Sequence, residues 1–147
     1  MQHRHSKPET PLLGNLTKQQ LEEVLRDSMT DEATAAEFYT ELINEAPDNL
    51  HTEFIEHARD DELIHLDYFK KLYRYLFGRD AEYGIEETKY ANYEAGLLMA
   101  LKGELEAAGT YRDVELSVRD PLIRETFYYA MIDELEHATQ FSTLYNR

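Results

Sequence analysis

Two short stretches decide how this chain folds: DELIH at residues 61–65 and DELEH at residues 133–137. They lie 72 residues apart, and the same offset relates the apolar positions that follow them, for example Phe69 and Phe141. Because an α-helix advances about 100° per residue, the Glu and His of each stretch share one face with these apolar residues. The two stretches therefore indicate two copies of one helix, each with its Glu–His pair directed inward.

A second pattern, Glu-x-x-Ala-x-x-x-Tyr, starts at Glu32 and returns at Glu104, again 72 residues later. Two unrelated segments would not share one offset at so many positions, so the chain contains an internal repeat. No useful length of sequence alternates with the period of two that is typical of strands. The sequence predicts an all-α fold, a four-helix bundle built from two repeated helical hairpins.

Start and stop signals place the four helices. Thr17-Lys-Gln-Gln20 is a capping box, Asp48 follows a proline turn, Gly78 ends a helical pattern, and Asp120-Pro121 is a strong start signal. The predicted helices span about residues 18–45, 49–77, 87–118 and 121–147. We interpret residues 1–16 as a flexible tail and residues 17–147 as the single bundle domain.

Composition excludes several classes of function. The 147 residues carry a net charge of −15, which argues against nucleic acid as a partner, and contain no apolar run long enough to span a membrane. The absence of cysteine excludes disulfides, thiol catalysis and cysteine-ligated metals within this chain. Because the first residues also lack the apolar core of a signal peptide, we expect a cytoplasmic protein.

The inward-facing polar residues point to metal. Burying four carboxylates without partners would cost several kcal/mol each, and Arg59 is the only basic residue near these helix faces. Two divalent cations would balance four glutamates and two neutral histidines, and mixed oxygen and nitrogen ligands suit iron or manganese better than a structural zinc. The predicted ligands are Glu32, Glu62, His65, Glu104, Glu134 and His137.

Four neighbours of these ligands have weaker patterns. Asp61 and Asp133 each precede a ligand Glu, and we expect them to hydrogen-bond the outer nitrogen of the histidine on the opposite hairpin. Tyr39 and Tyr111 lie two turns from the ligands Glu32 and Glu104. They are either core aromatics or hydrogen-bonding or redox partners of the site.

The other histidines carry little signal. His57 follows Glu53 by four residues, but Tyr129 occupies the matching position of the second copy. We therefore interpret His57 as a structural or surface residue, and we assign no role to His3, His5 or His51.

These motifs resemble the ferritin-like superfamily and, within it, the rubrerythrin-like and bacterioferritin-like proteins. DELIH and DELEH look like the second- and fourth-helix motifs of that superfamily, and the patterns that start at Glu32 and Glu104 look like its first and third. The resemblance covers about residues 18–147. It implies a non-haem di-iron carboxylate oxidoreductase that reacts with hydrogen peroxide or dioxygen.

Two departures from that resemblance bear on the reaction. Peroxide-reducing rubrerythrins usually carry a four-cysteine rubredoxin domain, so this cysteine-free chain would need an external electron donor or Fe²⁺ itself. Many also carry an additional glutamate where this chain has Ala107, which leaves a six-ligand set closer to that of bacterioferritin and favours ferroxidase chemistry. Iron binding or storage without turnover, manganese catalase-like chemistry, and a structural bundle that has lost its metal remain as alternatives.

The resemblance also implies that the second and third helices run parallel. The second helix would be about 43 Å long, whereas residues 78 to about 87 reach only about 34 Å when extended. Either the bundle is up-down-up-down, or the third and fourth helices complete the site of a partner chain. The sequence therefore predicts a homodimer with swapped domains.

Overall fold

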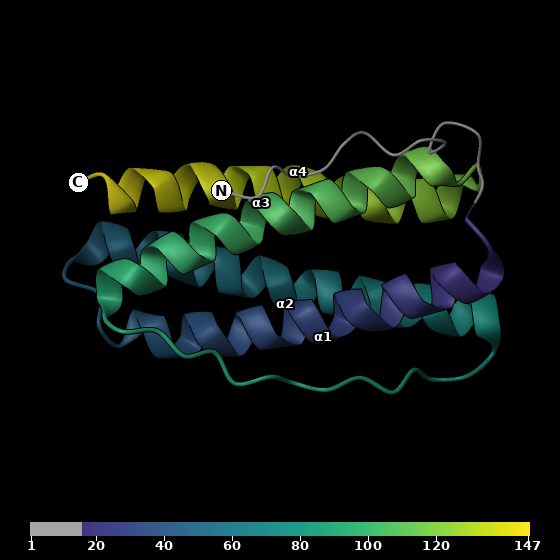
Figure 1. The fold of residues 1–147 in the computed structure, drawn as a ribbon, viewed down its shortest axis with the longest axis horizontal. Helices are drawn as coiled ribbons and strands as arrows, with labels where there is room; N and C mark the ends of the chain where they lie inside the picture. Colours follow the sequence, from purple (N-terminus) through teal and green to yellow (C-terminus); the bar gives the residue numbers. More distant parts are fainter. Residues whose placement is uncertain (1–15) are drawn as a thin grey trace.

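The computed structural model describes residues 16–147, which form one bundle of four long helices and, within this range, contain no strand (Figure 1). The helices are α1 Lys18–Ile43, α2 Asn49–Phe77, α3 Tyr93–Ser117 and α4 Pro121–Tyr145. This confirms the all-α prediction. The predicted tail lies, apart from Leu16, outside the described residues. None of the four helices is long and apolar enough to cross a membrane.

Caps that were predicted from the sequence fix four of the eight helix ends. Thr17 and Gln20 form the predicted capping box, each side chain accepting a hydrogen bond from the other's backbone N–H. The side chains of Asp48 and Asp120 accept backbone N–H groups at the starts of α2 and α4. Gly78 ends α2 with a positive φ of 71°, a conformation that glycine adopts without strain.

The third helix begins later than predicted, at Tyr93 rather than near residue 87. Asn92 caps it by accepting a hydrogen bond of 2.8 Å from the N–H of Ala95. The preceding segment instead lies along α1, where the N–H of Glu86 donates to Thr34 Oγ1 at 2.9 Å. These contacts with α1 hold the segment extended and delay the start of the helix.

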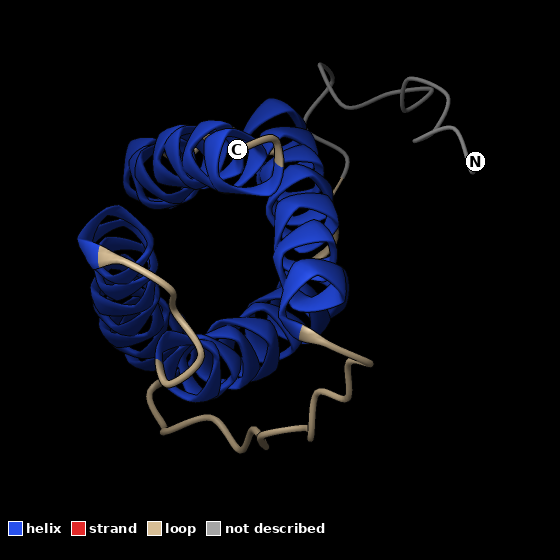
Figure 2. Cartoon of the chain, turned by 90° about the vertical axis from the view of Figure 1, so that its left-hand side faces the viewer, coloured by secondary structure: helices blue, strands red, loops and turns tan. Residues whose placement is uncertain are grey.

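The later start changes the geometry of the connection. The fifteen residues between Phe77 and Tyr93 can reach about 50 Å, more than the roughly 43 Å length of α2. They run back along the outside of the bundle, so α2 and α3 point the same way (Figures 1 and 2). The bundle is therefore not up-down-up-down, and one chain can complete a site without swapping domains. The premise of the swap was wrong, whereas a homodimer as such stays a prediction.

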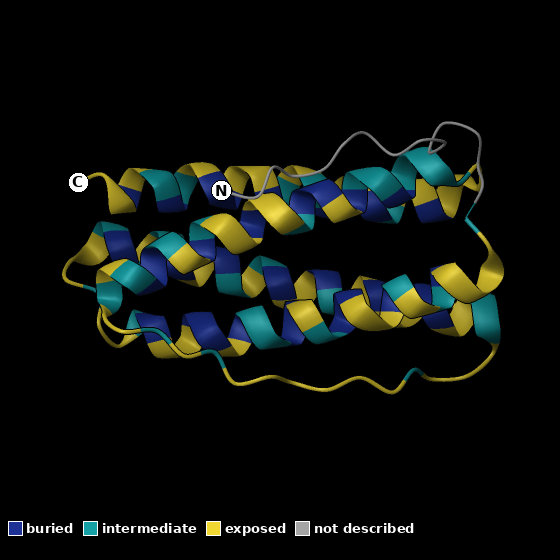
Figure 3. Cartoon of the chain, in the orientation of Figure 1, coloured by how far each residue is buried: buried dark blue, intermediate teal, exposed yellow. Residues whose placement is uncertain are grey.

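Packing follows the repeat. The two hairpins, α1 with α2 and α3 with α4, join mainly through α2 and α4, while α1 and α3 barely touch. Seen from one end, the helices form a ring (Figure 2). Buried residues recur along every helix (Figure 3) and make two apolar clusters, one containing Phe69 and Phe127, the other Ile55 and Phe141. The six predicted ligands are buried in the middle of the bundle, between the two clusters.

One glycine inside α3 has a packing reason. A Cβ atom on Gly96 would lie 2.8 Å from Leu42 Cδ1 and 3.1 Å from Tyr90 Cδ2. The missing side chain lets α1 and the crossover segment pack closely against the start of α3.

Candidate metal centre

Each of the six predicted ligands is at most 2% exposed, and together they occupy the middle of the bundle. Their ligand atoms form two overlapping groups of three carboxylates and one histidine, in which all atoms of a group lie within 4.8 Å of one another. The groups are Glu32, Glu62, His65 and Glu134, and Glu62, Glu104, Glu134 and His137. Since Glu62 and Glu134 belong to both groups, they occupy the positions of bridging ligands.

In the first group, His65 turns its Nδ1 atom towards the three carboxylates. This nitrogen lies 3.2 Å from Glu134 Oε1, 3.3 Å from Glu32 Oε2 and 3.5 Å from Glu62 Oε1. Charge-assisted hydrogen bonds are shorter, about 2.7–2.9 Å. Ligand atoms bound to one metal at about 2.0–2.2 Å lie roughly 3.0–3.5 Å apart, which these separations match.

The second group repeats this arrangement around His137. Its Nδ1 atom lies 3.3 Å from Glu62 Oε1, 3.4 Å from Glu104 Oε2 and 3.6 Å from Glu134 Oε1. The internal repeat thus produces two nearly equivalent groups, each of which could hold a cation, and the two groups share two carboxylates.

Several polar atoms at this centre are buried and lack a hydrogen-bond partner among the described residues. They are Glu62 Oε1, Glu104 Oε2, Glu134 Oε1 and His137 Nδ1. An unpaired buried acceptor costs about 1–3 kcal/mol, and more when it is charged. Arg59, the basic residue expected nearby, instead pairs with Asp60 at the surface. Cations fit this donor set, because they would satisfy the unpaired oxygen and nitrogen atoms at once.

The buried carboxyl groups also repel one another when they are charged. Burial, followed by the charges of Glu104 and Glu32, raises the pKa of Glu62 well above its ordinary value. Burial and the same neighbours likewise raise the pKa of Glu134. Burial and the repulsion between these carboxylates therefore favour the protonated form of Glu62 and Glu134 in the metal-free protein.

For the two imidazole rings, the surroundings favour the charged form, whereas for the carboxyl groups they favour the neutral form. Burial by itself would lower the pKa of His65, but the hydrogen bond to Asp133 and the nearby carboxylates of Glu134 and Glu32 outweigh it and raise that pKa to about 12. For His137 burial again opposes, and the bond to Asp61 contributes most to raising the pKa to about 10. The surrounding carboxylates therefore favour the charged form of both rings in the metal-free protein.

Two aspartates orient these rings from outside. Asp133 Oδ2 lies 2.7 Å from His65 Nε2, and Asp61 Oδ2 lies 2.7 Å from His137 Nε2. Each aspartate reaches the histidine of the opposite hairpin, which is the contact that the sequence predicted. Because each carboxylate accepts a hydrogen bond from Nε2–H, Nδ1 is the ring nitrogen that faces the centre.

Two tyrosines also cross between the hairpins. The buried hydroxyl of Tyr39 donates to Glu104 Oε1, and that of Tyr111 donates to Glu32 Oε1. Burial, followed by the charge of the adjacent carboxylate, raises the pKa of both phenols, so they remain donors. Of the two interpretations left open by the sequence, the structure favours hydrogen-bonding partners of the candidate ligands.

We expect Tyr39→Phe to destabilise the metal-free protein by about 1–3 kcal/mol, because Glu104 would lose its one hydrogen bond while its other oxygen is already unpaired. Urea unfolding with a chelator present measures this. The matched control is Tyr90→Phe, which removes an exposed hydrogen bond to Glu45 and should change the free energy of unfolding by less than about 0.5 kcal/mol. Equal effects of the two changes would contradict this assignment.

A cavity of about 300 Å³ opens between α1 and α3, where these helices barely touch. It reaches all four candidate carboxylates but neither histidine. Small residues such as Ala35, Gly103 and Ala107 line it further out. The carboxylate side of the centre is therefore accessible to a small molecule, whereas the histidine side is closed by α2 and α4.

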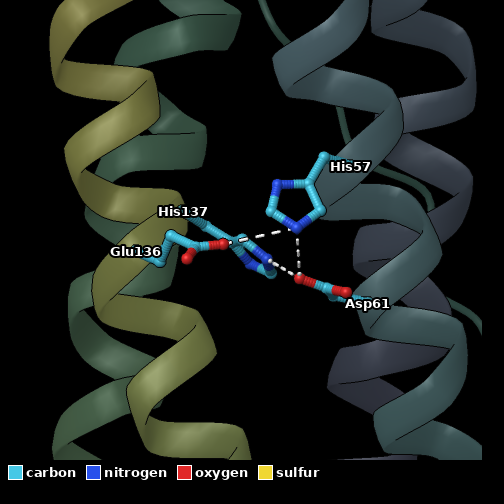
Figure 4. A group of neighbouring side chains, drawn as sticks. All are labelled: His57, Asp61, Glu136 and His137. Carbon is cyan, nitrogen blue, oxygen red and sulfur yellow. Dashed lines mark hydrogen bonds and ion pairs between the residues drawn. The ribbon is translucent and has the colours of Figure 1, made fainter.

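The remaining histidines differ in their surroundings. His51 pairs with the Tyr93 hydroxyl at 2.7 Å, while His3 and His5 lie outside the described residues. His57 is exposed, in agreement with its interpretation as a structural or surface residue. Its ring reaches Asp61 (Figure 4), and the i,i+4 spacing of the two was the available signal for this contact.

No protein-family model matches the chain, and no curated protein sequence matches it. A two-domain protein from Anabaena variabilis with DJ-1/ThiJ/PfpI-like and ferritin-like domains has a similar solved structure, at a TM-score of 0.70 and 14% sequence identity. The match covers 88% of this chain and 37% of that protein, so this chain spans little more than a third of its length. At this identity the similarity concerns the fold alone. The chain has the fold of a ferritin-like four-helix bundle.

Proposed function

We propose that this chain is a non-haem di-iron carboxylate oxidoreductase that reacts Fe(II) with hydrogen peroxide or dioxygen. The observation that carries the proposal is a buried set of four carboxylates and two imidazoles with unpaired atoms, reached by a cavity. In a core stabilised only by packing, unpaired buried charges would lower the stability of the fold. The oxygen and nitrogen donors suit iron and also manganese.

The residues divide into three roles. Glu62 and Glu134 would hold both ions, and each remaining ligand would hold one. Asp61 and Asp133 keep the proton on the outer nitrogen of each histidine, so that the inner nitrogen binds. The Tyr39 hydroxyl orients its carboxylate from the opposite hairpin.

When bound, two iron ions supply two electrons, which with two protons convert hydrogen peroxide to two waters or dioxygen to hydrogen peroxide. The cavity between α1 and α3 admits small molecules to the carboxylate side. The apolar clusters on either side, which include Phe69 and Phe141, keep bulk water out of the helix core.

Ala107 lines this cavity at the position where a seventh ligand would be expected in many rubrerythrins. A six-ligand set supports ferroxidase chemistry over peroxide reduction. Because the chain contains no cysteine, electrons for repeated turnover would come from an external donor or from Fe²⁺.

The test is to load the protein anaerobically with two Fe(II) per chain and mix it rapidly with hydrogen peroxide or with dioxygen. Oxidation followed by the near-ultraviolet absorbance of ferric carboxylate should be at least about tenfold faster than for free Fe(II), because the ligands hold both ions together. A faster reaction with dioxygen indicates a ferroxidase, and a faster one with peroxide indicates peroxide reduction. Rates equal to those of free Fe(II) would contradict the proposal.

Metal analysis of protein purified without added metal complements this experiment. Iron at two ions per chain supports the proposal. Manganese at that stoichiometry would favour catalase-like chemistry at the same residues.

A further inference from the structure

A row of three aromatic rings leads from the candidate metal centre to the outside of the bundle. Tyr39 lies beside the centre, where its hydroxyl donates to Glu104 Oε1. Its ring centroid lies 5.4 Å from that of Phe38, which in turn lies 5.3 Å from that of Tyr90. Tyr39 and Phe38 belong to α1, whereas Tyr90 belongs to the crossover segment, which runs along the outside of the bundle (Figure 1). Steps of this size are short enough for electrons to tunnel between the rings.

Both phenols of this row have a carboxylate in position to take a proton. The hydroxyl of Tyr90 donates to Glu45 Oε2 at 2.8 Å, and Glu45 is exposed. A phenol that loses an electron becomes a strong acid, so it is oxidised readily where a base stands within hydrogen-bond reach. Glu104 is such a base for Tyr39, and Glu45 is one for Tyr90. Burial, followed by the hydrogen bond to Glu45, raises the pKa of Tyr90 to about 12, so this phenol holds its proton until it is oxidised.

The fold makes room for the outer phenol. Tyr90 is partly buried and packs against the apolar cluster that contains Phe38 and Phe141. A Cβ atom on Gly96 would lie 3.1 Å from Tyr90 Cδ2, so a side chain at this position of α3 would crowd the ring. Packing therefore holds the Tyr90 ring against Phe38 while its hydroxyl lies at the exposed Glu45.

The internal repeat provides a comparison within the same molecule. Tyr111, the counterpart of Tyr39, makes the equivalent hydrogen bond to Glu32. The counterpart of Phe38 is Thr110, which has no ring. The Tyr111 ring contacts Phe69 and Phe127, which contact each other and are fully buried. Both halves thus place a phenol at the centre, but the row of rings from that phenol to a surface phenol is an addition to one half.

We propose that Tyr39, Phe38 and Tyr90 form a path through which the centre draws single electrons from the protein surface, an inference that rests on the proposed function. The path operates when hydrogen peroxide requires more electrons than the bound iron supplies. The partner is a small one-electron reductant in solution, such as an enediol or a phenol, because the path ends at a hydroxyl beside an exposed carboxylate.

The electrons and protons balance as follows. Hydrogen peroxide takes up two electrons, and two protons from solvent, to become two waters. A centre with a single Fe(II) supplies one electron, and Tyr39 supplies the other while its phenol proton moves to Glu104. Tyr90 then passes one electron through Phe38 to the Tyr39 radical, which takes its proton back from Glu104. The phenol proton of Tyr90 moves to Glu45 and returns when the external reductant gives Tyr90 one electron.

The test follows the tyrosyl radical by electron paramagnetic resonance rather than turnover. The natural chain, loaded anaerobically with one Fe(II), is mixed with one equivalent of hydrogen peroxide and then with ascorbate. In Tyr90→Phe, which keeps the ring and removes the hydroxyl, the radical should stay on Tyr39, which is 2% exposed. Ascorbate should therefore remove the radical at least about tenfold more slowly in Tyr90→Phe than in the natural chain.

A second variant tests the bridging ring. Phe38→Leu keeps both phenols but removes the ring between them, so ascorbate should again remove the radical more slowly than in the natural chain. The matched control is Tyr83→Phe, which removes another phenol of the crossover segment. The Tyr83 ring lies under the Lys70 ammonium, at 4.9 Å, and its substitution should leave the radical lifetime unchanged.

The outcomes separate this path from the proposed function. Equal radical lifetimes in the natural chain and in Tyr90→Phe, or no radical in either protein, would overturn the path. If the protein with two Fe(II) still oxidises its iron rapidly, the proposed function then stands without it. Iron oxidation no faster than that of free Fe(II) would overturn the proposed function, and the path with it.

Discussion

Glu62→Gln is expected to abolish tight binding of the metal pair while leaving the metal-free protein at least as stable as before. Glu62 belongs to both candidate groups, so a neutral amide there removes a ligand from each ion. We expect metal affinity to fall by about 100-fold or more, equivalent to about 2.8 kcal/mol. In the metal-free protein, burial and the charges of Glu104 and Glu32 raise the pKa of this group, so its charged form is disfavoured and a neutral amide suits the same surroundings.

The opposite responses of binding and stability identify the role of the residue. Competition with a chelator gives the affinity, and urea unfolding of the metal-free protein gives the free energy. Glu53→Gln, an exposed position on the same helix, should change neither. A metal-free Glu62→Gln protein destabilised by several kcal/mol would show instead that Glu62 stabilises the fold through its own contacts, and unchanged affinity would exclude it as a ligand.

Features set by local spacing were predictable from the sequence. The caps at Thr17, Asp48 and Asp120 depend on residues one turn away, so their patterns determine the structure found. Convergence of the six candidate ligands was predictable because the repeat marks the positions that both hairpins retain, and apolar neighbours orient them inward. Their role in binding metal stays a prediction.

Features set by contacts between distant segments were not predictable. Residues 87–91 contain no strong helix breaker, and they stay extended because the crossover binds α1, for example where the Tyr90 hydroxyl donates to Glu45 at 2.8 Å. The ion pair of His57 was not predictable for a related reason. Its partner Glu136 lies on another helix, and a repeat comparison discards what only one copy contains.

The pH dependence of stability is expected to differ between the metal-free and metal-loaded proteins. In the metal-free protein, folding raises the pKa of Glu62 and Glu134 above 4.5, and that of His65 from 6.5 to about 12. A raised pKa adds stability that is complete below the unfolded value and is lost as pH rises through the folded one. The free energy of unfolding of the metal-free protein should therefore fall as pH rises above 4.5. The fall is about 1.4 kcal/mol per pH unit for each proton that the folded state holds and the unfolded state does not.

Metal reverses this trend, because bound ligands must be deprotonated and the folded state then holds fewer protons than the unfolded one. The stability of the loaded protein should rise with pH through the unfolded values of 4.5 and 6.5 and then level off. Urea unfolding between about pH 5 and 8, with metal and with chelator, should give two curves that diverge with pH. In weakly buffered solution, metal loading should release protons. Their number should match the difference between the slopes of the two curves. Parallel curves would show that the buried carboxyls and imidazoles do not exchange protons for metal, and the charge balance at the centre would then need another source.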